Sequence, residues 1–324
     1  MKFKIILSIL LSVCIIFTFT FGNKKINEKK GLIELESVSE ILTLWHVDTF
    51  EGGTGSRKQF LSKVVREFEK KYKSVLIYVV EKTPESIKED FSKNIYPDML
   101  SFGNGISVNN LVELDVKLDY NFTKFGDKVL AVPWCRGGYC LIENPNFNKK
   151  QGGNICSVSQ GKFNLPLCNV LDSNLEIKIN SQFNAYLEFV NLKSRYLLGT
   201  QRDIVRLTNR NFSFTCTPLE YFNDLYQYVS VIDSGKSKTK ISKLFVDFLL
   251  SEKIQKRLTE IDMISCFFDL EYQNENMKNL QKIKNLKSVS FLTEPKILLE
   301  LQALSLKAAN KDQSSILNLK KFII

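Results

Sequence analysis

The segment EGGTGSRKQF, residues 51–60, has the glycines and basic side chains of a phosphate-binding loop. It follows the apolar run ILTLW (41–45) and precedes an amphipathic segment, so it falls at a strand-to-helix turn, where such loops occur. Its spacing fits neither common phosphate motif. A Walker loop separates its glycines by four residues and ends in Gly-Lys-Ser/Thr, and a dinucleotide loop needs a glycine three residues after Gly55. We therefore expect the glycines to let the backbone approach a bound solute and to begin the first helix, where Arg57 would also suit an anionic ligand.

Two carboxylates and the only histidine of the chain lie beside this loop: Asp48, Glu51 and His46. A pair of carboxylates is the minimum machinery of a glycosidase. The GxSxG and HExxH motifs of other hydrolases are absent, and acidic residues at the start of a helix also gain from its dipole. We expect His46 to orient the loop and the protein not to be an enzyme; an exported glycosidase is the alternative.

Six of the seven cysteines lie beyond the N-terminal apolar run. They form no CxxC pair and have no histidine at ligand spacing, so the sequence predicts no metal site and no cofactor. Cys135 and Cys140 are close enough in sequence for a disulfide across a turn, and buried free thiols are the alternative.

The first residues have the pattern of an export signal. Lys2 and Lys4 precede the apolar run IILSILLSVCIIFTFTF (5–21), after which the chain turns polar. Residues 1–22 are therefore a signal peptide or membrane anchor, and the lysine- and glutamate-rich residues 23–40 are a linker.

The mode of anchoring stays open. LSVC at 11–14 has the pattern of a lipobox that would lipidate Cys14, but Val13 is larger than the expected residue and the apolar run continues. The uninterrupted run is also just long enough to span a bilayer. Lipid attachment, a membrane anchor and ordinary cleavage all place residues from about 40 onward at the extracellular face of the membrane.

Composition is that of a folded protein, with 44% hydrophobic and 11% aromatic residues, and 324 residues suggest about two domains. The formal net charge is +10. The lysines are spread along helical faces and no nucleic-acid-binding motif accompanies them, so we expect a solvated basic surface and no nucleic-acid partner.

The first part of the chain alternates strands and helices. The strand ILTLW is followed by a helical pattern in SRKQFLSKVVREFEKKY, the strand VLIYVV (75–80), a short helix from Pro84 and the strand DMLSFG (98–103). This order predicts a doubly wound parallel sheet. Ligands bind at the carboxyl ends of such strands, which selects the loops 45–55 and 102–106.

Later elements are less regular. VLAVPWCRGGYCLIEN (129–144) predicts two short strands separated by a turn at Gly137-Gly138, and residues 145–175 predict loops. Residues 181–199 predict a helix and then a strand, and 238–258 predict a strong helix. The last quarter of the chain predicts mainly helix.

The series TLWHVDTFEGG, EFEKKY, YPDMLSFGNG, AVPWCRGGYCLIEN, GTQRD and FVDFLLSEKIQKRL, in this order from about residue 41 to 266, resembles the extracellular solute-binding proteins of bacterial ABC transporters, specifically the sugar-binding type of family 1. The resemblance implies a two-lobe periplasmic-binding-protein-like α/β fold, with doubly wound sheets joined by a hinge. It implies a sugar held in the cleft and a closed form presented to permease subunits in the membrane.

The resemblance also divides the chain into lobes. Lobe 1 would comprise 41–128 plus about 226–262, and lobe 2 would comprise 129–225 plus about 263–324. Residues 145–180 are shorter than the family's second lobe usually is. The alternative function is therefore a degenerate binding lobe that serves as a surface sensor or adhesion module.

A sugar site needs flat aromatic faces and planar hydrogen-bonding groups. The only two tryptophans, Trp45 and Trp134, both fall at predicted strand ends beside glycine-rich turns. With the correspondence to the family, the expected cleft is lined by Trp45, Asp48, Glu51 and Asn104 on one side and by Trp134, Arg136, Tyr139, Gln201 and Arg202 on the other.

Overall fold

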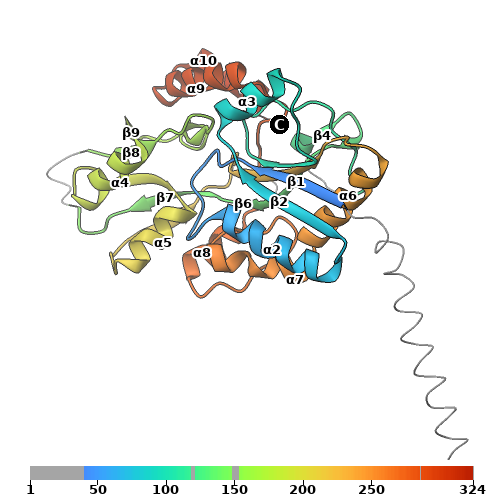
Figure 1. Cartoon of the computed structure of the whole chain (residues 1–324). Helices are drawn as coiled ribbons and strands as arrows, with labels where there is room; N and C mark the ends of the chain where they lie inside the picture. The colour runs from blue at the N-terminus through green and yellow to red at the C-terminus, as the bar shows by residue number, and fades with distance from the viewer. Residues whose placement is uncertain (1–39, 118–120, 148–152, 285, 324) are drawn as a thin grey trace, which may run out of the picture.

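The computed structural model describes residues 40–117, 121–147, 153–284 and 286–323. The expected signal, Cys14 and almost all of the linker lie outside these residues. Within them, no helix is both long and apolar enough to cross a bilayer. The described chain forms two α/β lobes, each built on a five-stranded sheet (Figure 1).

The first lobe contains the predicted alternation of strands and helices. Its elements are β1 (Glu40–His46), α2 (Arg57–Lys71), β2 (Val75–Glu81), α3 (Pro84–Ser92) and β3 (Met99–Phe102). The sheet order is β2-β1-β3-β12-β6, with β12 (Tyr226–Val231) and β6 (Val132–Arg136) from later in the chain. The strands β1, β2 and β3 are parallel as predicted, and β12 is antiparallel to both of its neighbours.

The helices of this lobe begin where the sequence provides caps. The Ser56 side chain accepts a hydrogen bond from the Gln59 N–H at the start of α2, and Thr83 and Ser86 form a reciprocal capping box on α3. The buried side chains of α2 include Phe60, Val64 and others one or two turns apart, so one helical stripe faces the sheet. Helices α2 and α6 (Lys236–Leu249) cover one face, and α3 covers the other (Figure 1).

The second lobe is more regular than the sequence predicts. Its elements are β7 (Tyr139–Glu143), β8 (Ile155–Ser159), β9 (Glu176–Asn180), α4 (Gln182–Val190), β10 (Tyr196–Thr200), α5 (Gln201–Asn209) and β11 (Thr215–Pro218), in the order β11-β7-β10-β8-β9. The prediction of loops over 145–175 is therefore wrong in part. It misses β8, the 3-10 helix η2 (Pro166–Asn169) and, just beyond, β9. Five-residue strands are too short to carry a clear period.

The boundary between the lobes also differs from the prediction. The strands flanking Gly137-Gly138 are not a hairpin, because β6 pairs with β12 in the first sheet and β7 pairs with β10 and β11 in the second. The first crossing therefore lies at 137–138 and not at 129. A Cβ on Gly137 would collide with the Gln201 side chain, which explains a glycine at this close approach.

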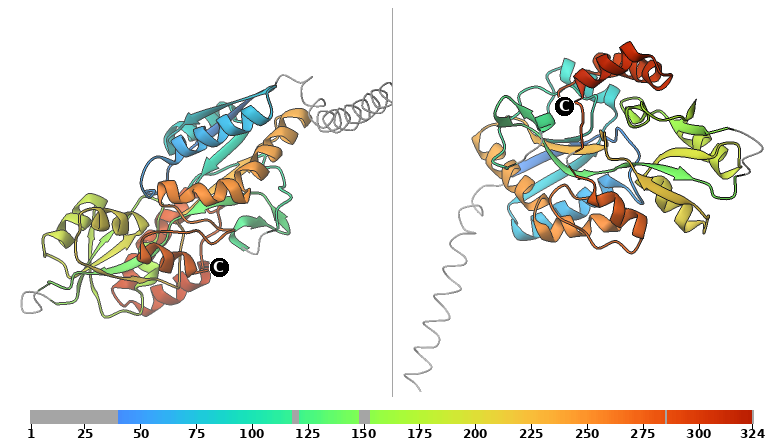
Figure 2. Two further views of the ribbon diagram at one scale, coloured as in Figure 1. Left: turned by 90° about the horizontal axis from the view of Figure 1, so that it is seen from below. Right: turned by 180° about the vertical axis from the view of Figure 1, so that it is seen from behind.

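The C-terminal part crosses between the lobes repeatedly. After α7 (Glu252–Gln255) and the 3-10 helix η3 (Lys256–Ile261), α8 (Glu275–Lys282) contacts α5 and β11 of the second lobe. The ring of Phe291 then packs on Phe102 and Tyr228 of the first lobe. Finally α9 (Pro295–Ala309) packs against η2, with α10 (Gln313–Phe322) beside it (Figure 2).

The six cysteines of the described chain are free. Cys135 and Cys140 lie in strands of different sheets, β6 and β7, and both are buried. Burial raises the pKa of Cys135 well above its usual value. These side chains therefore act as small apolar residues of the core.

Candidate functional site

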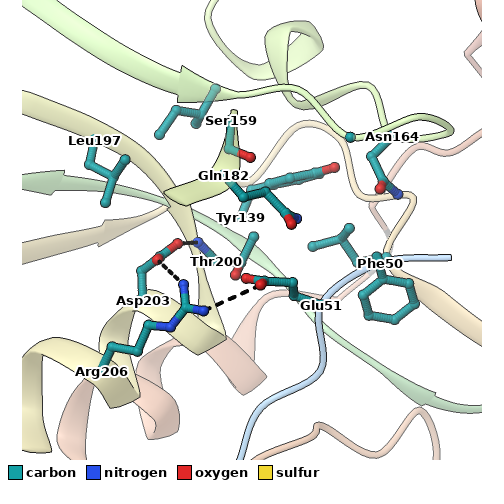
Figure 3. A pocket seen from close by; sticks show the side chains of 13 residues that line it. Phe50, Glu51, Tyr139, Ser159, Asn164, Gln182, Leu197, Thr200, Asp203 and Arg206 are labelled. Atoms are coloured by element: carbon teal, nitrogen blue, oxygen red, sulfur yellow. Dashed lines mark hydrogen bonds and ion pairs between the residues drawn. The ribbon is translucent and has the colours of Figure 1, made fainter. Parts of the chain in front are cut away.

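Side chains of both lobes surround a cavity at their boundary (Figure 3). The first lobe provides Phe50 and Glu51, and the crossing segment provides Leu225. The second lobe provides Tyr139, Ser159, Gly161, Asn164, Gln182, Leu197, Leu198, Thr200, Asp203 and Arg206. The cavity volume is about 30 Å³. That volume suits one or two water molecules, since small-molecule sites usually measure roughly 300–1,000 Å³.

A chain of charged groups crosses this cavity. Arg206 forms an ion pair with Glu51 at 3.3 Å and lies 3.7 Å from Asp203 (Figure 3). Glu51 also forms an ion pair with Arg202 at 3.4 Å. Asp203 is held by the start of α5, where the Thr200 N–H donates to its carboxylate at 3.0 Å. Burial raises the pKa of Asp203 to about 6, against the opposing effects of the Thr200 hydrogen bond and the Arg206 charge. The cavity thus has opposite charges from the two lobes facing each other.

The backbone of the glycine-rich segment is in contact with other parts of the protein, and these contacts leave no open space for a solute beside Gly53. Arg202 Nη1 donates to the Gly53 carbonyl at 2.6 Å, and Gln201 Nε2 donates to the Glu51 carbonyl at 3.2 Å. A Cβ on Gly53 would collide with the backbone carbonyls of Ile261 and Asp262. The glycines also precede α2, as predicted. The adjacent residues Gln201 and Arg202 of α5 bind this segment to the second lobe.

A buried carboxylate joins the lobes behind the cavity. Asp224 Oδ1 accepts a hydrogen bond from the Tyr139 hydroxyl at 2.7 Å, and Oδ2 accepts one from the Leu165 N–H at 2.7 Å. Asn104 of the first lobe donates to the Asp224 carbonyl at 3.1 Å. Burial raises the pKa of Asp224 to about 7, although these donors act to lower it. Asn104 and Tyr139, both expected at the site, therefore meet at one residue of the crossing.

The two tryptophans lie in the core and not on the cavity. Trp134 is 0% exposed, its ring stacks on Phe60 at 5.8 Å between centroids, and its Nε1–H donates to Ser101 Oγ at 3.0 Å. Trp45 stacks on Phe91 with 6.1 Å between ring centroids, and the Lys82 ammonium lies over the Trp45 ring at 4.4 Å from its centroid. Both belong to buried strand positions of the first lobe, so neither ring face is open to a solute.

Arg136, which was also expected at the site, instead binds backbone carbonyl groups. Arg136 is buried and donates to the carbonyls of Gly137, Gln281 and Ile283, at 3.1, 3.2 and 2.7 Å, which ties the C-terminal segment to the first crossing. These hydrogen bonds engage the Arg136 guanidinium, which does not line the cavity.

Asp48 lies 2.6 Å from Arg57 Nη2 and 3.0 Å from His46 Nε2. Partial burial raises its pKa, but the His46 hydrogen bond and the Arg57 charge outweigh burial and leave the pKa lowered. His46 orients this loop, as predicted, through Asp48 and through Ser101 Oγ at 3.0 Å. Asp48 lines a different hollow from Glu51, together with Glu81, Lys82 and Thr83.

Of the predicted residues, the structure brings Glu51, Tyr139, Gln201 and Arg202 together at the boundary, with Asn104 behind them. The sequence analysis missed Phe50, Asn164, Gln182, Asp203 and Arg206. One signal was present for two of them: Thr200-x-x-Asp203 is a capping-box spacing, and the amphipathic helix that follows places Arg206 one turn later.

A second, larger hollow lies on the same boundary, between α3, residues 105–109, Lys162-Phe163 and the start of α9. Its volume is about 560 Å³. The Phe163 ring lies directly on Gly105, where a Cβ would collide with it, and Lys162 forms an ion pair with Glu85 of α3. Residues 161–164 therefore contribute to both hollows and touch the first lobe.

The comparisons with known proteins bear on the fold. No protein-family model and no curated protein sequence matches the chain. Solved structures do match over most of their length. The GacH receptor of Streptomyces glaucescens has a TM-score of 0.57 at 14% identity, covering 86% of this chain and 95% of that one.

Two others are similar. The sugar-binding protein MalE of Xanthomonas citri has a TM-score of 0.60 at 11% identity, covering 87% and 96%. The maltose-maltodextrin binding protein of Alicyclobacillus acidocaldarius has a TM-score of 0.58 at 12% identity, covering 87% and 98%. The chain therefore has the two-lobe fold of these binding proteins, which confirms the predicted fold class.

Proposed function

We propose that the chain is the extracellular solute-binding component of a bacterial ABC transporter, which holds a sugar between its lobes and delivers it to permease subunits. The observation that carries this proposal is the cavity at the lobe boundary, into which both lobes of this fold direct polar side chains. The structural neighbours support it, because the GacH receptor was solved in complex with acarbose and MalE is a sugar-binding protein.

The residues around the cavity suit a carbohydrate. Glu51, Asn164, Gln182, Asp203 and Arg206 provide carboxylate, amide and guanidinium groups, which form planar hydrogen bonds with ring hydroxyls. Phe50 and Tyr139 provide rings for the apolar face of a sugar. Gln201 and Arg202, at the edge, complete the set from the second lobe.

Sugar entry requires the lobes to separate, because about 30 Å³ cannot hold a monosaccharide. Separation would break the Glu51 ion pairs, the Arg202 and Gln201 hydrogen bonds to the loop, and the Lys162–Glu85 pair. The ion pairs are partly or largely exposed, so solvent screening makes each one weak. Hydroxyl groups of a sugar would then take over the freed donors and acceptors.

The N-terminal residues complete the proposal. The apolar run 5–21 behind Lys2 and Lys4 has the features of an export signal or anchor. The lobes would accordingly work at the extracellular face of the membrane, held by a lipid on Cys14 or by the apolar segment itself.

The test is isothermal titration calorimetry of the full chain with a panel of neutral mono- and oligosaccharides. Arg206→Ala and Arg210→Ala form a matched pair, since both guanidinium groups lie over the Tyr186 ring, at 5.7 and 5.3 Å, but only Arg206 reaches Glu51 and the cavity. We expect saturable heat with one sugar, lost or weakened at least about tenfold in Arg206→Ala and kept in Arg210→Ala. A folded protein that gives no heat with any sugar would contradict the proposal.

The closed cavity also favours a second function, a surface sensor or adhesion module that binds no sugar. Its support is the small volume of the cavity beside Glu51, about 30 Å³, which keeps a solute out of this cavity while the ion pairs hold the lobes together. Small-angle scattering distinguishes the two functions. A radius of gyration that changes on addition of a sugar supports transport, and one that is constant across the panel supports the second function.

A further inference from the structure

The first lobe concentrates its exposed apolar side chains at the end that faces away from the second lobe. Among the described residues of this lobe, the large hydrophobic side chains that are exposed are Ile41, Leu76, Tyr78, Ile95 and Phe125. Ile41 and Leu76 are paired at the beginning of the parallel strands β1 and β2, and Ile95 lies in the loop that enters β3. Tyr78 follows Leu76 on the same face of β2.

Phe125 belongs to the hairpin of β4 (Lys124–Phe125) and β5 (Lys128–Val129), directly before β6. Because β6 runs in the same direction as β1, this hairpin lies at the same end of the sheet, close to the start of α6 (Figures 1 and 2). The Phe125 side chain is 66% exposed at the tip. An exposed phenylalanine beside a glycine turn has no role in the core, and clustered apolar exposure marks an interaction surface.

The same end is rich in lysine. α2 ends there, α6 begins there, and residues 111–117 run beside β5 and the end of β12. Two lysines of this end are paired, Lys93 with Glu89 and Lys238 with Asp98. The lysines of this end that form no ion pair with another residue of the described chain are Lys70, Lys71, Lys73, Lys117, Lys124, Lys128, Lys236 and Lys240. These unpaired lysines outnumber the other acidic residues of this end, which are the half-buried Glu40 and the exposed Glu113, Asp115, Asp127 and Asp233. We call this surface the basic end.

The chain enters the structure at the basic end. β1 begins at Glu40, and the preceding sequence contains the apolar run 5–21 flanked by lysines. Residues 22–39 can reach at most about 60 Å when fully extended. A bilayer that takes up the apolar run therefore lies within reach of the basic end, and the second lobe is on the other side of the first.

We propose that the basic end lies on the surface of a bilayer containing anionic lipids. The lysines contact the headgroups, and Phe125 enters the interfacial layer, as do Ile41 and Leu76 toward the opposite edge of the sheet. Both parts of this arrangement have a physical basis, since lysines near an anionic surface are attracted within about a Debye length, and exposed aromatic side chains partition into the interface. The first lobe would thus face the membrane, and the second lobe would face away from it.

The experiment uses tryptophan as a depth reporter in the full chain, reconstituted in vesicles of brominated phosphatidylcholine with about 30% phosphatidylglycerol. Phe125→Trp places the reporter at the basic end, and Phe183→Trp places it on α4 of the second lobe. The two positions are matched in exposure, at 66% and 67%, and share the buried Trp45 and Trp134 as background. We expect quenching in Phe125→Trp at least about twofold stronger than in Phe183→Trp.

The second part of the experiment tests the contribution of the lysine charges. Adding Lys124→Glu and Lys128→Glu to Phe125→Trp, or raising the salt concentration to about 0.5 M, is expected to remove most of the extra quenching. Both lysines are on the surface hairpin, so their reversal leaves the two cores intact. Equal quenching of the two reporters would overturn the proposal, as would equal quenching of Phe125→Trp in vesicles of phosphatidylcholine alone.

Discussion

The two lobes contribute unequally to the cavity between them. The first lobe provides only Phe50 and Glu51, whereas the second provides the polar side chains of β7, β8, α4 and α5. The first lobe instead keeps its large side chains inside, with Trp134, Phe60 and Phe102 fully buried. On the proposed function, the first lobe would serve as a frame and the second lobe would carry most of the groups that contact the ligand.

The largest effect on stability is expected when Trp134, in the core of the first lobe, is truncated. Trp134→Ala removes a fully buried ring that packs on Phe60, and leaves Ser101 without its indole donor. We expect the free energy of unfolding to fall by about 3–5 kcal/mol, measured by urea denaturation followed by circular dichroism. A loss below about 1 kcal/mol would mean that the ring faces solvent and that the first lobe does take part in ligand contact.

Asp224 tests the connection between the lobes through pH. Burial raises its pKa to about 7 in the folded protein, from an ordinary value of 3.8. A raised pKa in the folded state means that stability is fully present below about pH 4 and is lost as pH rises to about 7. The expected loss is roughly 3–4 kcal/mol over this window.

Asp224→Asn keeps an oxygen acceptor and removes the titration. We expect the fall in stability between pH 4 and 7 to be mostly absent in this variant, in urea titrations at a series of pH values. The difference between the two proteins is the quantity to measure, since Asp203 also has a raised pKa. Parallel profiles would show that Asp224 does not titrate in this range.

The smallest effect is expected at the charged contact across the boundary. Glu51→Gln removes the ion pairs with Arg202 and Arg206, all of them about one-third exposed. We expect a loss of only about 0.5–1 kcal/mol, smaller still at high salt, in thermal unfolding at two salt concentrations. A loss of several kcal/mol would mean that the lobes are held together as one unit, and the contrast between frame and recognition surface would then fail.

The same contrast explains which parts of the fold were predictable. In the first lobe, local signals agree with the final arrangement: ILTLW alternates with an amphipathic helix and a β-branched strand, and all three form as expected. In the second lobe, the strands β8 and β9 are five residues long and lie between loops, so no period distinguishes them. The strand β12 was also missed, because all of its residues are buried and its sequence therefore shows no sustained alternation of apolar and polar residues.

The site was harder to predict than the fold. Two strands around Gly137-Gly138 are typical of a hairpin, and only long-range pairing sends them to different sheets. Trp45 and Trp134 stand beside glycine turns, as ligand-binding aromatics do, yet the direction of a side chain on a short strand depends on the partner strands. Glu51, Gln201 and Arg202, which the structure brings to the lobe boundary, lie in a loop and at a helix start, where the chain is free to present polar groups.

The C-terminal segment has a consequence for how the protein is made. Phe291 completes the aromatic cluster with Phe102 and Tyr228 of the first lobe, and α9 then completes the second. Neither lobe can complete its packing until residues 291–309 have been synthesised, because the Phe291 ring and α9 both come from this late part of the sequence. For a chain exported as proposed, this dependence would keep both lobes incomplete while the chain is threaded through a membrane in an extended form.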